Sequence, residues 1–175
     1  MNNYTWTETF RALYDSAVAR YRAGNRAPAS CLTAGETAFL AAIGHTAQEL
    51  YDFAEDAVLS SEPSFADALL IAAVRRDYFL VVQKGKPSGR TIRMEELPPK
   101  DAAVAGLVWL PRIIPKARAK LRGEMPVELM YGCGGDRNFL KSVQVHPADF
   151  LRHVWAAGED DRKIIESVKH SVAGS

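Results

Sequence analysis

Three short signals in the first half of the chain mark where helices begin. In such a capping box a hydroxyl accepts a hydrogen bond from a helical N–H, and a carboxylate three residues later accepts one in return. Apolar residues recur at three-to-four spacing after each signal, as they do on an amphipathic helix. A fold with three helix starts so close together is expected to be all-α. The signals are Thr33 with Glu36, Thr46 with Glu49, and Ser64 with Asp67.

The same periodicity predicts an earlier helix over residues 7–23 and a second helical set after a polar stretch rich in Gly and Pro. We therefore predict two tandem, similar helical units over about residues 7–80 and 103–172. The corresponding domains are 1–83 and 103–175, joined by a linker over 84–102, and the two domains can pack as one globule. The helices expected in the second unit cover residues 103–122, 134–143, 147–157 and 160–172.

Two stretches leave the element type or its start open. Residues 77–83, "DYFLVVQ", either extend the preceding helix or pair with "TIRME" in a small β-hairpin near 78–94, and we favour the helix. Pro111 and Pro115 interrupt the 103–122 pattern, so the long helix is expected to start afresh near one of them.

The two halves match when the chain is shifted by one hundred residues. Phe39 meets Phe139, Leu40 meets Leu140, and Glu36 meets Asp136. The matches fall on core and capping positions, which a shared backbone would dictate. We interpret them as an internal duplication. The alternative is two unrelated amphipathic segments that happen to align.

Charge and composition exclude several classes of protein. The 22 basic and 21 acidic side chains give a net charge of +1, so no overall field favours nucleic acid, and the aromatic spacing of single-strand binders is missing. The sequence contains neither a long apolar span nor an export signal. Two cysteines without zinc-type spacing predict a cytoplasmic protein of bacterial type, with no metal and no cofactor.

The duplication directs attention to Cys133. It replaces the N-cap Thr33, and it lies in "YGCGGDRNF" beside Gly134, Gly135 and Arg137. A thiol at a helix N-terminus beside a cation can act as a nucleophile. We therefore name Cys133 as a candidate catalytic residue, with Asp136 orienting it and His146, which replaces Thr46, as base. The alternative is that Cys133 only fills space.

A cationic helix precedes this loop. Arg112, Lys116 and Lys120 share one side of the predicted helix, and Arg118 and Arg122 form a second stripe. These residues can form a face for an anionic metabolite or a phosphate backbone, although a solvated helix surface explains the same pattern. The other cations that could join this face are Arg75, Arg76, Lys84, Lys86, Arg90 and Arg93. The residues that we expect to bind such a ligand are Arg112, Lys116, Tyr131, Gly134, Gly135 and Arg137.

The stretch "GLVWLPRIIPKARAKLRGEMPVELMYGCGGDRNFLKSVQVHPADFLRHV" resembles a bacterial family known as a domain of unknown function. That family is marked by a similar Leu-Pro-Arg-x-Ile-x-Lys-Ala-Arg segment, which is followed by Tyr-x-Cys and an Asp. The resemblance covers about residues 100–170, and it implies that residues 110–118, Tyr131, Cys133 and Asp136 are marked positions. It brings no activity. The family also has a Gly-Ile-Asp-type entry into the next helix. The chain departs from the pattern at Pro115, where the family favours Asp, and at Gln144 and Val145, where the family has Gly-Ile.

Three functions therefore stay open. The first is binding of a small anionic or polar molecule where the Arg112 helix meets the Tyr131–Arg137 loop. The second is a cysteine-dependent enzyme that uses Cys133. The third is a non-catalytic protein that forms a homodimer through opposed charge stripes. The acidic residues gather at Glu49, Asp52, Glu55, Asp56, Glu62 and Asp67, and later at Glu159, Asp160 and Asp161.

Overall fold

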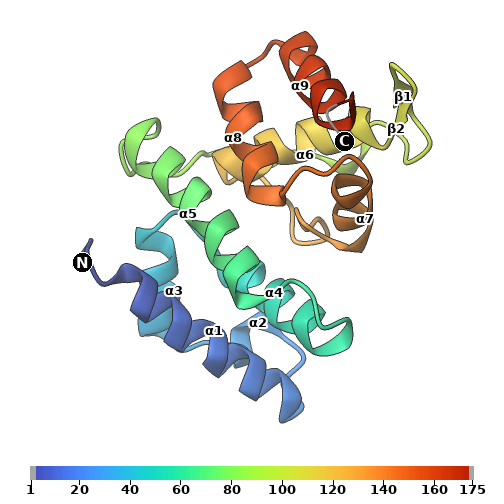
Figure 1. Cartoon of the computed structure of the whole chain (residues 1–175). Coiled ribbons are helices and arrows are strands. Elements are labelled where there is room, and N and C mark those ends of the chain that lie inside the picture. The colour runs from blue at the N-terminus through green and yellow to red at the C-terminus, as the bar shows by residue number, and fades with distance from the viewer. Residues whose placement is uncertain (1–2, 174–175) are drawn as a thin grey trace. The chain divides into compact units, whose positions relative to one another are not determined.

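The computed structural model describes residues 3–173, and helices form nearly all of its regular structure (Figure 1). The all-α prediction is confirmed. The chain divides into two compact units, Met1–Pro87 and Ser88–Ser175. The first unit contains α1 (Trp6–Arg22), α2 (Pro28–Cys31), α3 (Ala34–Ala42), α4 (Ala47–Leu59) and α5 (Phe65–Val81). The second contains the 3₁₀ turn η1 (Met94–Glu96), β1 (Ala103–Val104), β2 (Leu107–Val108), α6 (Leu110–Arg122), α7 (Gly134–Ser142), α8 (Pro147–Ala157) and α9 (Asp161–Ala173).

The core of the first unit lies between α1, α4 and α5. The apolar face of α1 is buried from Phe10 to Tyr21. The aromatic rings of α1 pack against rings of the neighbouring helices. Tyr14 stacks edge-on against Phe65 of α5, and Tyr21 stacks edge-on against Tyr51 of α4. Burial of each such side chain contributes roughly 1.5–3 kcal/mol to folding, so these rings account for much of the unit's stability.

All three predicted capping boxes form. Thr33, Thr46 and Ser64 are the N-caps of α3, α4 and α5. In each case the N-cap hydroxyl accepts from the backbone N–H of the acidic residue three positions on, and the carboxylate of that residue accepts from the N-cap N–H. In α3 the Thr33 N–H donates to Glu36 at 2.6 Å. Because these bonds are local in the chain, the sequence alone was sufficient to place the helix starts.

The second unit is built around α6, which packs against α8 and α9. The apolar face of α6 is buried, and it contains Ile113, Ile114, Ala117 and Leu121. Lys116 and Lys120 were expected on a cationic surface, and this prediction is wrong. Both are only 2% exposed.

The residues before α6 differ from the prediction. A helix was expected from residue 103, but β1 and β2 pair there in a two-stranded antiparallel ladder, and α6 starts at Leu110. The reason lies in the turn: Ala105 and Gly106 both adopt positive φ, as a two-residue hairpin turn requires. Pro111 then suits the first turn of a helix. Upstream, α5 continues to Val81, so the helical interpretation of residues 77–83 is confirmed.

Residues 88–97, expected in a linker, pack onto α6 and the loop after it. Ile92 and Leu97 form a small apolar cluster with Ala119 and Leu129. The Ile92 N–H donates to the carbonyl of Glu124 at 2.9 Å. This segment therefore forms one wall of the second unit.

Local structure repeats at the predicted shift of one hundred residues. Helices α3 and α7 cover residues 34–42 and 134–142, α4 and α8 start at residues 47 and 147, and α1 and α6 end at residues 22 and 122. The turn between the paired helices is also the same, because His45 N bonds to Leu40 O as Val145 N bonds to Leu140 O. Both halves thus contain one helix–turn–helix pattern. That they arose by duplication stays a prediction.

One ion pair in the first unit gives a test through pH. Arg20 donates to both oxygens of Glu36, at 2.8 and 3.1 Å, and so ties α1 to α3. These hydrogen bonds lower the pKa of Glu36 to about 2. A lowered folded-state pKa stabilises the protein above the ordinary pKa and loses that effect as the pH falls toward 2. We predict that Glu36→Gln lowers the free energy of unfolding by about 1 kcal/mol at neutral pH.

The difference between wild type and Glu36→Gln should shrink as the pH is lowered toward 3. Denaturant unfolding at a series of pH values measures it. Glu128→Gln is the control, because Glu128 is exposed in the second unit. A Glu36→Gln difference that stays constant with pH would contradict the assignment.

Candidate functional site

Cys133 lies where the sequence placed it, at the N-cap of α7 with extended backbone. Its side chain is half-buried, whereas Cys31 is buried, and both are free thiols. Unlike Thr33 in α3, Cys133 makes no side-chain cap hydrogen bond to the helix. The sulfur is therefore not used to start α7.

Asp136, three residues further on, accepts hydrogen bonds from three donors, two on α6 and its N-cap and one in the loop before α7. Lys116 Nζ of α6 lies 2.6 Å from Oδ2, the Trp109 indole N–H lies 2.9 Å from Oδ1, and the Gly132 N–H lies 2.9 Å from Oδ2. The side chains of Lys116 and Asp136 are 2% and 0% exposed. A buried carboxylate needs this degree of pairing, because an uncompensated charge inside a protein costs several kcal/mol.

Lys116 also links this pair to the cysteine. Its Nζ lies 3.5 Å from Cys133 Sγ. The predicted site residues Cys133, Asp136 and Lys116 thus meet in one cluster between α6 and the start of α7. In this cluster an ammonium donor faces a half-buried thiol, and the carboxylate holds the ammonium in place.

A close approach of Trp109 to Gly135 completes the cluster. A Cβ atom at Gly135 would lie 2.5 Å from Trp109 Cζ2, closer than any real contact, whereas one at Gly134 would meet only Arg137 at 3.9 Å. Gly135 therefore has a packing role. Gly134 is exposed beside Cys133.

The other predicted ligand-binding residues make hydrogen bonds within the protein. Arg112 donates to the carbonyl of Pro98 at 2.6 Å, and the buried Arg137 donates to that of Gly132 at 2.6 Å. Tyr131 donates to the carbonyl of Pro147 at 2.8 Å, and burial raises its pKa well above the usual range. Tyr131 and Arg137 thus hold the loop in place, whereas Arg112 ties α6 to Pro98.

His146, the predicted base, is the N-cap of α8, and its Nδ1 accepts a hydrogen bond from Ala148 N at 3.1 Å. This nitrogen caps the start of α8, as the hydroxyl of Thr46 caps the start of α4. The bond belongs to the start of α8, and a catalytic role for His146 stays a prediction.

A second feature of this unit was only partly visible in the sequence. A hollow of about 120 Å³ lies beside the second half of α6. Its apolar walls come from Ile92, Leu97, Pro115 and Ala119, and its charged groups are Arg90, Arg118, Arg122, Glu96 and Glu124. Arg118 and Arg122 were recognised as a cationic stripe. The opposite wall was missed, because residues 90–97 read as linker.

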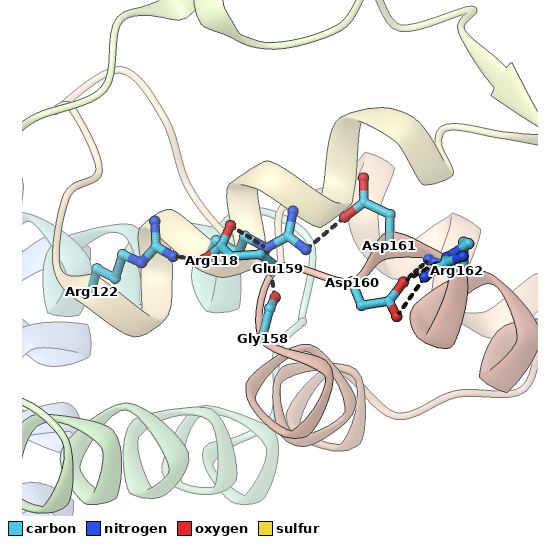
Figure 2. Close-up of polar contacts among 7 residues, drawn as sticks. All are labelled: Arg118, Arg122, Gly158, Glu159, Asp160, Asp161 and Arg162. Carbon is cyan, nitrogen blue, oxygen red and sulfur yellow. Dashed lines mark hydrogen bonds and ion pairs between the residues drawn. The ribbon is translucent and has the colours of Figure 1, made fainter.

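The turn between α8 and α9 supplies carboxylates to these arginines (Figure 2). Arg118 donates to Gly158 O at 3.0 Å and to Asp161 at 2.6 Å, and it lies 3.7 Å from Glu159. Arg122 pairs with Glu159. The Arg118 side chain is 15% exposed, but those of Glu159 and Asp161 are 72% and 55% exposed.

Metal and membrane sites receive no support in the described part of the chain. Within residues 3–173, His, Cys, Asp and Glu form no group of three or more that could hold a metal ion. None of the helices described there has the length and apolar character needed to cross a bilayer.

Comparison with known families gives one result. The profile of a family described as "Domain of unknown function (DUF5069)" matches residues 98–173. This match covers α6 to α9 and the cluster around Cys133, but not the wall of the hollow formed by residues 90–97. It agrees with the resemblance seen in the second half of the sequence. Among curated proteins and solved structures, no match to the chain was found.

The two adjacent glycines of α7 give a matched test of the cluster. Gly135→Ala must displace Trp109 and with it one hydrogen bond to Asp136. We predict a loss of about 2 kcal/mol in unfolding free energy, typical of overpacking a tight contact. Gly134→Ala adds the same methyl group to the same helix turn in open space, so it should be neutral or slightly stabilising. Equal effects in thermal or denaturant unfolding would show that Trp109 is not held against Gly135.

Proposed function

We propose that the second unit binds a small anionic molecule in the hollow beside α6. The observation that carries this proposal is the convergence of Arg90, Arg118 and Arg122 on one hollow with apolar walls. Ligand sites combine apolar walls with a few charged groups that fix orientation. A guanidinium can bind a carboxylate or phosphate through two parallel hydrogen bonds.

The present partners of these arginines are exchangeable. Arg90 pairs with Glu96 at 2.5 Å, and its side chain is 56% exposed. Exposed pairs of this kind contribute only about 0–1 kcal/mol each. A ligand anion that replaces one of them therefore meets little opposition. Because the whole chain carries a net charge of only +1, the attraction is local to the hollow.

The size of the hollow limits the ligand. A cavity of about 150 Å³ can hold a molecule as large as benzene. With about 120 Å³, the hollow is suited to a metabolite of a few carbon atoms and not to a polymer. This favours the small-molecule function over a nucleic-acid partner.

The loop near Cys133 is a less favourable place for the anion. Lys116 would have to leave Asp136, and removing one partner of a buried pair costs about 3–5 kcal/mol. Arg112 and Arg137 would have to leave backbone carbonyls. We therefore still expect an anion to bind on α6, the helix that contains Arg112. The proposed site lies about two turns nearer the C-terminal end of this helix.

A second candidate function rests on the contact between Lys116 and Cys133. The ammonium lies 3.5 Å from the half-buried sulfur. In a cysteine-dependent reaction the thiol would lose its proton to a base, and the thiolate would add to a carbonyl carbon while the C=O π pair moves onto the oxygen. The Lys116 N–H would face the negative charge that develops on that oxygen. Asp136 would hold Lys116 in position. His146 remains the proposed base for this alternative.

A cytoplasmic location and a homodimer are two further proposals. The two free thiols suit a reducing compartment such as a bacterial cytoplasm. A homodimer is the third alternative, and light scattering after gel filtration decides it.

We predict that Arg118→Gln abolishes most of the anion binding. Loss of a charge-assisted hydrogen bond of about 1.5–3 kcal/mol weakens affinity roughly tenfold or more. Two-dimensional NMR titration with succinate, benzoate and inorganic phosphate measures it, with shift changes expected near Ile92 and Ala119. Arg152→Gln is the control, since Arg152 pairs with Asp149 on the exposed side of α8, and it should change affinity less than about twofold. If none of the three anions shifts the wild-type spectrum, the proposal fails.

The cysteine alternative has its own test. If Lys116 activates the sulfur, Cys133 should react with iodoacetamide at neutral pH faster than the same thiol in the unfolded chain. Peptide mass spectrometry follows both cysteines, and Cys31, which is 1% exposed, reports any unfolding. A Cys133 rate at or below that of the unfolded chain would remove this alternative.

A further inference from the structure

We propose that the turn from Gly158 to Asp161 occupies the arginines in place of the ligand, and that the ligand is a small dicarboxylate. This inference rests on the proposed function of the hollow beside α6. The turn joins α8 to α9, and it presents two carboxylates to two arginines of α6 (Figure 2). The protein's own acids thus indicate which chemical groups the arginines accept.

The arrangement is specific within the turn. Glu159 lies against both Arg118 and Arg122, and Asp161 binds Arg118 from the other side. Asp160, between them in sequence, instead pairs with Arg162 at 3.1 Å, away from α6 (Figure 2). Two of the three acids therefore satisfy the arginines, and the third belongs to the start of α9.

The two sides of these contacts are unequally fixed. Arg118 is mostly buried, and its Nε also donates to the Gly158 carbonyl, so the guanidinium stays in position when a carboxylate leaves. Glu159 and Asp161 are mostly exposed, so water can solvate them at once after release. Exchange of the carboxylates leaves the arginines in place for a ligand.

The number of carboxylates indicates the ligand class. A monoanion can replace one of the two acids and leaves the other against Arg118. A molecule with two carboxylates can replace both, and a short hydrocarbon between them can lie on the apolar walls of Ile92, Leu97 and Pro115. The volume of about 120 Å³ restricts that hydrocarbon to a few carbons.

The turn and the ligand then compete for the same guanidinium groups. Removing the charge of Glu159 and Asp161 should strengthen binding. Three ion pairs are removed, each worth a small factor, so we expect an increase of about three- to tenfold in affinity for succinate. Succinate should also bind more tightly than butyrate, which has the same number of carbons and one carboxylate.

The experiment compares wild type, E159Q/D161N and D160N by isothermal titration calorimetry with succinate, butyrate and inorganic phosphate. D160N is the matched control, since it removes one charge from the same turn without touching Arg118 or Arg122. Asn keeps the acceptor oxygen that receives the Arg162 N–H. D160N should bind succinate within about twofold of wild type.

Each result decides one point. If E159Q/D161N binds succinate no more tightly than D160N, the turn does not compete, although wild-type binding would still support the hollow. If butyrate or phosphate binds as well as succinate, the ligand is not a dicarboxylate. If none of the anions binds any of the three proteins, the proposed function itself fails. Should the double variant not fold, E159Q alone carries the test, because Glu159 contacts both arginines.

Discussion

The buried pair of Lys116 and Asp136 fixes the rest of the second unit. It ties α6 to the start of α7 and is completed by Trp109 at the N-cap of α6. With 3.6 residues per turn, Arg118 lies about 200° around the helix from Lys116, and Arg122 returns to the side of Arg118. Burying Lys116 against α7 therefore directs Arg118 and Arg122 to the opposite face. Both candidate sites depend on this one rotation of α6.

Local signals made much of the fold predictable. Capping boxes and apolar periodicity depend on residues within one or two turns, so the helix starts at Ala34, Ala47 and Phe65 follow from sequence. The start of α6 could not be obtained that way. A short hairpin with two positive φ angles occupies residues 103–108, and no Asn-Gly or Asp-Gly signal announces it.

The candidate site was predictable only in part, because its decisive contacts join distant segments. The thiol of Cys133 could be placed at a helix N-terminus, since the comparison with Thr33 needs only the sequence. That Lys116 is buried could not be predicted, because a lysine at helical spacing with Arg112 and Lys120 is typical of a solvated face. Its partner lies twenty residues away. The hollow required residues 90–97 to fold back onto α6, and their polar composition hid the buried Ile92 and Leu97.

The two halves share a backbone pattern but use the side chains at the helix starts differently. In the first unit the N-cap hydroxyls and the carboxylates of Glu36 and Glu49 are all used in capping boxes. In the second unit Asp136 bonds to Gly132 and Lys116 instead, and Cys133 makes no cap bond. The chain thus gives up one local stabilising device at the start of α7 and replaces it with a buried ion pair from another helix. Such a replacement keeps its stability only if both oxygens of the buried carboxylate are hydrogen-bonded, and the three donors to Asp136 reach both of them. The thiol of Cys133 is half-buried and makes no cap bond, and this is the physical reason why chemistry at Cys133 is the alternative to binding at Arg118.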